Sequence, residues 1–137
     1  MEVDLKAEPH PVMVARREVR GALAVASVPE LVCEDAVLVT GELVANAALH
    51  AGGPGLLRLT VLDDGALRIE VNDAGPGLPH HRPPSPGRPG GHGLQVVHLL
   101  SRSWGTLSGP GGKTVWAEIP GAVPQGPGGP PRAGEGR

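Results

Sequence analysis

The chain has 137 residues, a net charge of −2 and one cysteine. Apolar residues make up 39% of the chain and aromatic residues 1%. This length fits a single domain, and a lone Cys33 excludes an internal disulfide framework and favours a reducing compartment. Without a basic block, Phe or Tyr, direct nucleic-acid binding is not expected. No apolar run approaches the roughly 20 residues of a membrane helix, and the N-terminus lacks a signal pattern, so we expect a cytoplasmic protein that binds no membrane.

Two helices are predicted in the N-terminal half. Residues 1–11 read as a flexible arm. Residues 12–26 place apolar side chains at helical spacing on one face, and three arginines fall largely on the other face: Arg16, Arg17 and Arg20. These arginines form either a solvated face or a docking surface for an acidic partner. A second helix is expected over residues 30–50. It is apolar around most of its circumference, so it should be covered on more than one side.

A hairpin follows, with Leu57, Leu59 and Val61 alternating with polar residues, then Asp64-Gly65 as the turn signal. Its second strand alternates in the same way through Val71. The run PGLPHHRPPSPGRPGG is too rich in Pro and Gly for a regular element, and a loop of this length is usually functional or disordered.

The C-terminal half ends in a helix and two strands. The helix starts at Gly93 with LQVVHLLSR, WGTLS is a short strand candidate, and KTVWAEIP is a closing strand. Residues 121–137 have too little apolar content to fold and should be disordered. Residues 12–120 therefore form one α+β domain. We expect a two-layer α/β sandwich with helices on one face of a mixed, mostly antiparallel sheet.

The segment GELVANAALHAG carries a polar stripe on an apolar helix. Glu42, Asn46 and His50 are spaced by four residues, so they share one helix face. Burying a carboxylate or an amide without partners costs several kcal/mol. The stripe therefore faces a cavity, a ligand or a metal, unless these side chains simply cap loops or meet solvent on a partly exposed face.

Three further segments contain polar groups suited to binding a ligand: a carboxylate, free backbone N–H groups and a hydroxyl. VNDAGPGLP ends a strand with Asp73, a carboxylate that accepts from an exocyclic amine, while Gly75 and Gly77 allow close approach of a ring; the alternative is an ordinary turn. GGHGL opens a helix with free N–H groups that suit phosphate. Thr114 lies on the closing strand, where its hydroxyl would share a hydrogen-bond network with Asp73.

The chain resembles the GHKL ATPase superfamily over roughly residues 12–120. The resemblance depends on four motifs that occur in the order E-x-x-x-N, D-x-G-x-G, G-x-G-L and G-K-T. ELVANAALHAG, VNDAGPGLP, GGHGLQVV and GGKTVWAEIP look most like bacterial anti-sigma-factor serine/threonine kinases and related actinobacterial ATP-binding regulators. The resemblance implies ATP and Mg²⁺ as cofactors, a sigma factor and an anti-anti-sigma-type protein as partners, and a homodimer.

The resemblance also implies residue roles. Glu42 would be the catalytic general base, Asn46 the protein ligand of Mg²⁺, and Asp73 the acceptor of the adenine amine, with a lid over about residues 76–90. The implied nucleotide contacts are Asn46, Asp73, Gly75, Gly77, Gly91, His92, Gly93, Leu94 and Thr114.

Two positions depart from the family pattern. Leu49 stands where related kinases often have Arg or Lys, and His92 stands where many have Arg. These changes put efficient phosphoryl transfer in doubt, because transfer depends on positive charge around the γ-phosphate. The histidines also offer an alternative metal site, although no cysteine or carboxylate joins them at ligand spacing; they are His80, His81, His92 and His98.

Three functions are therefore weighed. The first is a regulatory kinase that phosphorylates Ser or Thr on an anti-anti-sigma-type partner and otherwise sequesters a sigma factor. The second is a nucleotide-dependent protein-binding module without kinase activity. The third, a catalytic fragment of a histidine kinase, is disfavoured because residues 1–11 cannot supply a dimerisation helix with a phospho-acceptor histidine.

Overall fold

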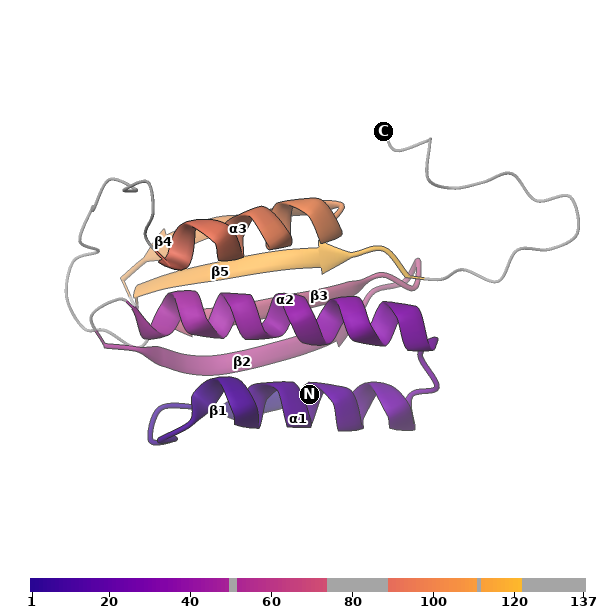
Figure 1. Cartoon of the computed structure of the whole chain (residues 1–137), viewed down its shortest axis with the longest axis horizontal. Coiled ribbons are helices and arrows are strands. Elements are labelled where there is room, and N and C mark those ends of the chain that lie inside the picture. The colour runs from indigo at the N-terminus through magenta and orange to yellow at the C-terminus, as the bar shows by residue number, and fades with distance from the viewer. Residues whose placement is uncertain (50–51, 74–88, 111, 122–137) are drawn as a thin grey trace, which may run out of the picture.

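The computed structural model describes residues 1–49, 52–73, 89–110 and 112–121, and over these residues three helices cover one face of a five-stranded sheet (Figure 1). The helices are α1 (Pro11–Val25), α2 (Glu30–Ala48) and α3 (Pro89–Leu100). The strands are β1 (Glu2–Asp4), β2 (Pro54–Val61), β3 (Leu67–Asp73), β4 (Ser103–Gly109) and β5 (Gly112–Ile119). The spatial order is β1-β2-β3-β5-β4, and each neighbouring pair is antiparallel. The predicted two-layer α/β sandwich is confirmed.

The N-terminal segment differs from the expected flexible arm. Glu2–Asp4 pair with β2 as an edge strand, and Leu5 is only 1% exposed. Backbone hydrogen bonds hold this strand in place: the Leu59 N–H donates to the Met1 carbonyl at 2.9 Å, and the Leu5 N–H donates to the Gly55 carbonyl at 2.7 Å. The strand is too short for its alternation to stand out in the sequence, and only pairing with β2 stabilises it.

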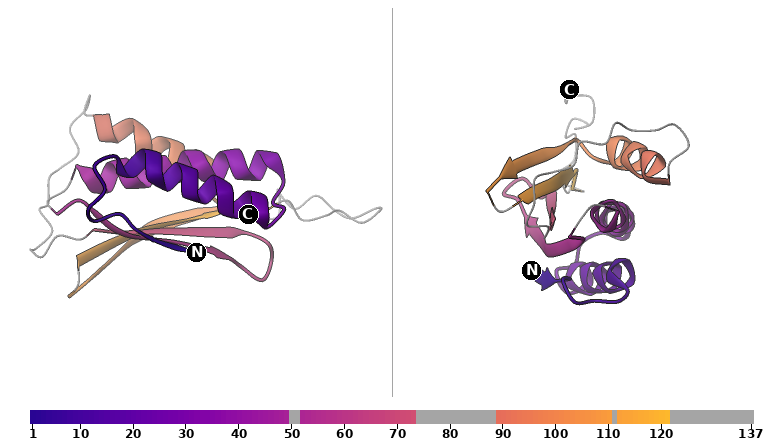
Figure 2. Two further views of the ribbon diagram at one scale, coloured as in Figure 1. Left: turned by 90° about the horizontal axis from the view of Figure 1, so that it is seen from below. Right: turned by 90° about the vertical axis from the view of Figure 1, so that its left-hand side faces the viewer.

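Helix α2 is the centre of the helical layer. It lies between α1 and α3 and against the sheet, as the end-on view in Figure 2 shows. Val39, Leu43 and Val44 are fully buried. The expectation that a helix apolar around most of its circumference must be covered on more than one side is therefore confirmed.

Five residues connect β2 and β3, and a hydrogen bond between Leu62 and Ala66 closes the hairpin around the central three of them rather than around two. The Leu62 N–H donates to the Ala66 carbonyl at 2.8 Å, and the Gly65 N–H donates to the Leu62 carbonyl at 2.9 Å. Gly65 has φ of 89°, a conformation that suits glycine. This pattern is the common three-residue connection, in which a turn is followed by a left-handed residue.

Helix α3 begins at Pro89, four residues before the predicted start at Gly93. Proline is favoured in the first turn, where its missing N–H would have no intrahelical partner. Val97 is fully buried against the core. Beyond the helix, Trp104 packs against the same core, and its indole N–H donates to His98 Nδ1 at 3.3 Å.

The face of the sheet opposite the helices carries a row of charged side chains. Arg68 donates to Glu118 at 2.7 Å and to Glu70 at 3.3 Å, and its guanidinium lies 4.3 Å from the centre of the Trp116 ring. Arg102 binds Glu118 as well. We refer to this side of the sheet as the open face; on β5 it includes Trp116 and Glu118.

Candidate functional site

The predicted motifs come together at one end of the molecule. The end of α2, the end of β3, the start of α3 and the connection between β4 and β5 all lie at the left in Figure 1. The register explains part of this convergence, because Pro54, which begins β2 shortly after α2, is opposite Asp73 at the end of β3. Antiparallel pairing of β2 with β3 therefore brings Asp73 near the C-terminal end of α2, the helix that carries Glu42 and Asn46.

Glu42 and Asn46 lie on the α3 side of α2. Each of them directly follows a residue that faces α1. Ala45, before Asn46, lines a groove between α1 and α2, and Gly41, before Glu42, lies beside the Arg16 side chain of α1. A step of one residue rotates the side chain by about 100° around the helix. The two polar side chains are thus turned away from α1, and both are partly buried. The third member of the predicted stripe, His50, lies outside the described residues.

Asp73 is the last residue of β3 and is partly buried. Leu67, Ile69 and Val71, which alternate with it, are buried under the helices. Because successive side chains of a strand point to opposite faces, Asp73 lies on the helix side of the sheet. It therefore shares both its side of the sheet and its end of the molecule with the polar residues of α2.

Thr114 does not fit its predicted role beside Asp73. Val115, Ala117 and Ile119 are buried on the helix side of β5, so Thr114 points to the open face. The register agrees, because Thr114 is opposite Asn72 rather than Asp73. A shared network between Thr114 and Asp73 would have to pass through the sheet, and the expectation is corrected.

The remaining predicted contacts are partly outside the described residues. Gly75, Gly77 and residues 76–88 of the predicted lid are outside the described residues, and so are residues 122–137 of the tail predicted for 121–137. The backbone of Gly91, His92 and Gly93 lies near the start of α3, and Leu94 is partly buried in it. These glycines are inside the first turns of the helix rather than in a loop before it.

The described residues give no support to a metal site built from protein side chains alone. Among them, no group of three or more His, Cys, Asp or Glu residues is arranged to hold a metal ion. The side chain of Asn46, in contrast, offers one amide oxygen at a partly buried position on the α3 side of α2. Mg²⁺ prefers oxygen ligands and keeps several waters, so this donor fits an ion held mainly by phosphate oxygens.

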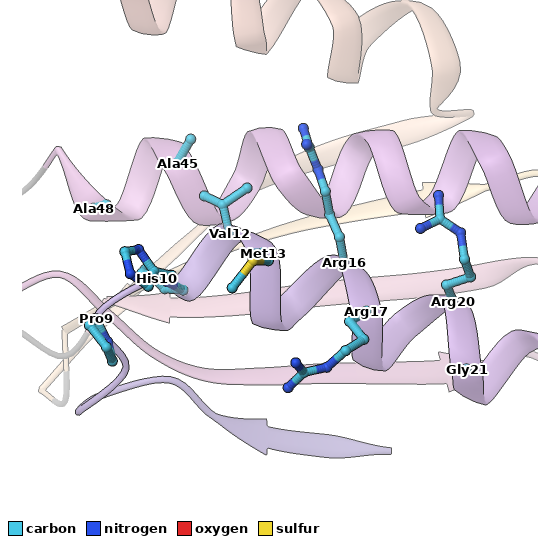
Figure 3. Close-up of a pocket in the computed structure, with 11 residues that line it drawn as sticks. Pro9, His10, Val12, Met13, Arg16, Arg17, Arg20, Gly21, Ala45 and Ala48 are labelled. Carbon is cyan, nitrogen blue, oxygen red and sulfur yellow. The ribbon is translucent and has the colours of Figure 1, made fainter.

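A groove of about 970 Å³ lies on the other flank of α2, between this helix and α1 (Figure 3). Its walls include Met13 and three arginines, and Arg17 and Arg20 are exposed. Arg16 does not fit the solvated-face alternative, because its Nε is buried and its guanidinium lies against Gly41. The groove faces away from Glu42 and Asn46, so it is separate from the converging polar residues.

The sequence of this chain matches a known protein family over most of its length. The model of the histidine kinase-like ATPase domain matches residues 5–119. The chain belongs to this family. No curated protein matches the chain.

Solved structures share the fold of this histidine kinase-like ATPase domain. The structure of the RsbU and RsbW domains of a Mycobacterium tuberculosis protein matches with a TM-score of 0.67 and 22% identity, over 90% of this chain and 33% of that one. A blue-light activated histidine kinase of Erythrobacter litoralis matches with a TM-score of 0.55 and 22% identity, over 86% of this chain and 42% of that one. The present chain thus spans between a third and a half of each of these two structures.

A histidine kinase-like ATPase domain binds ATP, and the match includes both the α2 motif and the end of β3. No helix in the described part of the domain has the length and apolar character needed to cross a bilayer.

Proposed function

We propose that the protein is an ATP- and Mg²⁺-dependent regulatory kinase that phosphorylates a serine or threonine on an anti-anti-sigma-type partner. The observation that carries this proposal is the placement of Glu42 and Asn46 on the α3 side of α2, at the same end of the molecule as Asp73. The likeness to a structure containing an RsbW domain supports the choice of partner class.

Each side chain has a distinct task in this proposal. Asp73 accepts a hydrogen bond from the adenine amine and sets the position of the base. Asn46 directs its amide oxygen to Mg²⁺, which when bound offsets the charge of the phosphates. Glu42 accepts the proton of the partner's hydroxyl as that oxygen bonds to the γ-phosphorus and the bond to ADP breaks.

The partner would dock outside the nucleotide site. The groove between α1 and α2 exposes Arg17 and Arg20 beside apolar Met13, which suits a surface with carboxylates and some apolar area. A sigma factor sequestered when the first partner is unavailable, and a second copy of the chain, complete the proposed assembly. A protein that uses ATP and these partners would act in the cytoplasm, and this localisation is part of the proposal.

The alternative is a nucleotide-dependent binding module that transfers no phosphate. The observation that favours it is Leu49, which follows α2 as an exposed apolar residue at a position where the resembling kinases often have a cation. With His92 in place of an arginine, fewer fixed positive charges surround the γ-phosphate.

A transfer assay with radiolabelled ATP and candidate partners separates the two functions. In the kinase, Glu42→Ala abolishes labelling of the partner and leaves ATP binding within about twofold, because the carboxylate acts on the attacking hydroxyl rather than on the nucleotide. Glu34→Ala is the matched control, since Glu34 is an exposed glutamate of the same helix. Labelling by Glu42→Ala at the wild-type rate would exclude the proposed base.

Nucleotide binding has its own test. Asp73→Asn keeps the shape of the side chain but replaces the carboxylate that receives the adenine amine, and we expect ATP affinity to fall about tenfold. Calorimetric titration measures the change. If wild type binds ATP and Asp73→Asn binds it equally well, the base lies elsewhere; if wild type binds ATP but labels no partner, the binding-module function replaces the kinase.

A further inference from the structure

The register between β3 and β5 indicates that Lys113, rather than Thr114, is the β5 residue on the same side of the sheet as Asp73. Val71 is opposite Val115, and Asn72 is opposite Thr114. Asp73 and Lys113 come one step beyond these last paired residues. If the register continues unchanged, the two residues are opposite each other, and both are within their strands. Residues directly opposite in an antiparallel pair point to the same face, with Cβ atoms about 5 Å apart.

The side-chain alternation of β5 gives the same answer independently. Val115, Ala117 and Ile119 are buried on the helix side, and Lys113 has the same parity. Trp116 and Glu118, which have the parity of Thr114, contact Arg68 on the open face. Lys113 is partly buried, as are Asp73 and Asn46.

A carboxylate and an ammonium side by side match one edge of adenine. The base presents the 6-amino group as a donor next to N1 as an acceptor. An ionised carboxylate only accepts and a lysine ammonium only donates, whereas a threonine hydroxyl does both. The flexible four-carbon stem of lysine also lets its ammonium reach a ring atom one position away from the atom that Asp73 contacts.

We propose that Lys113 donates a hydrogen bond to N1 of the adenine whose amine is bound by Asp73, and that it takes the base-contacting role first assigned to Thr114. This inference rests on the proposed function, because it requires ATP at Asp73. It gives the site a charged donor, so recognition of the base depends on N1 as well as on the amine.

The test uses ATP and 1-deaza-ATP, which keeps the amine and replaces N1 with a C–H group. Calorimetric titrations compare wild type with Lys113→Met, which keeps most of the stem and removes the donor. ATP affinity falls about tenfold in the variant because a charge-assisted hydrogen bond is lost. Affinity for 1-deaza-ATP stays at the wild-type value, since that nucleotide has no N1 acceptor to lose.

Two variants serve as controls. Thr114→Val removes a hydroxyl from the open face and leaves both affinities unchanged. Lys113→Arg retains a donor and therefore retains a preference for ATP over 1-deaza-ATP. Thermal unfolding followed by circular dichroism establishes that each variant is folded.

The outcomes separate this inference from the proposed function. Unchanged ATP binding in Lys113→Met overturns the inference, and so does an equal loss for both nucleotides, which would place the ammonium against the phosphates. A loss confined to Thr114→Val would overturn the register argument. If wild type binds ATP but Asp73→Asn binds it equally well, the proposed adenine site itself fails and the inference fails with it.

Discussion

Arg16 of α1 lies across Gly41 of α2, in the space that a β-carbon at position 41 would occupy. A β-carbon built there would meet the Arg16 Cζ at 2.7 Å, and the Nε of Arg16 is buried without a hydrogen-bond partner among the described residues. The glycine therefore allows a charged side chain to lie over a helix backbone, at the cost of weaker helix propensity.

This relationship predicts the effect of Gly41→Ala. The obstructing atoms are the far end of a flexible side chain, which can turn outward to solvent, and alanine favours the helix by about 1 kcal/mol over glycine. We expect the variant to be as stable as wild type or more stable, by up to about 1 kcal/mol in chemical denaturation. In an Arg16→Ala background the gain should be larger, because nothing has to move. A loss of stability in both backgrounds would show that the helix backbone itself shifts.

The substitution Leu5→Ala tests whether the N-terminal segment, which the sequence did not predict to be ordered, packs against the core. Its side chain is 1% exposed within the core, so Leu5→Ala should lower the free energy of unfolding by about 2–4 kcal/mol. Leu31→Ala is the control, since Leu31 is 75% exposed and should change stability by about 0.5 kcal/mol or less. Urea denaturation measures both. Equal effects would mean that the N-terminal segment does not pack as described.

Arg68 links two carboxylates on the open face. Arg68→Met keeps much of the packing against Trp116 but leaves Glu70 and Glu118 without their shared cation. We expect a loss of about 1–2 kcal/mol in the free energy of unfolding at low salt, and a smaller loss at 1 M salt, where these charges are screened.

Arg17→Met is the matched control for this substitution. The Arg17 side chain is 66% exposed and approaches Glu18 only at 3.9 Å, whereas the Arg68 side chain is 24% exposed. An exposed pair of this kind contributes about 0–1 kcal/mol. If the two variants are equally stable, the charge row on the open face has no net effect on folding.

The interaction of Asp64 with Arg102 predicts that the stability of the fold depends on pH. Its hydrogen bond with the Arg102 guanidinium, followed by that from the Ala66 N–H, lowers the pKa of the Asp64 carboxyl below its ordinary value of 3.8. A carboxylate with a lowered folded-state pKa stabilises the fold above its unfolded pKa, and this contribution is lost as the pH falls through the folded value.

The corresponding measurement compares wild type with Asp64→Asn across pH. Wild type should be the more stable protein at pH 6, and the difference should shrink as the pH falls below 3.8 toward 2. Thermal unfolding at a series of pH values gives the two curves. Parallel curves over this range would show that the Arg102 contact does not depend on the charge of Asp64.

Much of the fold follows from local patterns. The helical spacing of apolar residues in α1 and α2, and the strict alternation in β3 and β5, locate these elements because each pattern has a short period. The stripe of Glu42 and Asn46 and the motif at Asp73 are also visible in the chain, since burial of such groups requires a ligand or a partner.

Other features depend on contacts between distant segments. Glu2–Asp4 form a strand only because β2 offers an unpaired edge, and the Nε of Arg16 is buried only because Gly41 lies opposite it. The alternation of KTVWAEIP shows that Lys113 and Thr114 point to opposite faces, but it does not say which of them meets Asp73. That choice is made by the β3–β5 register, and a shift of one residue would exchange the two side chains.

The linear order of residues was thus sufficient for the family and the two-layer architecture, because these depend on short-range spacing. The side of the sheet on which each strand residue lies, and the partners of the helix arginines, were decided only when the chain folded. The physical reason is that pairing register and helix packing depend on atoms far apart in the sequence, which no local period encodes.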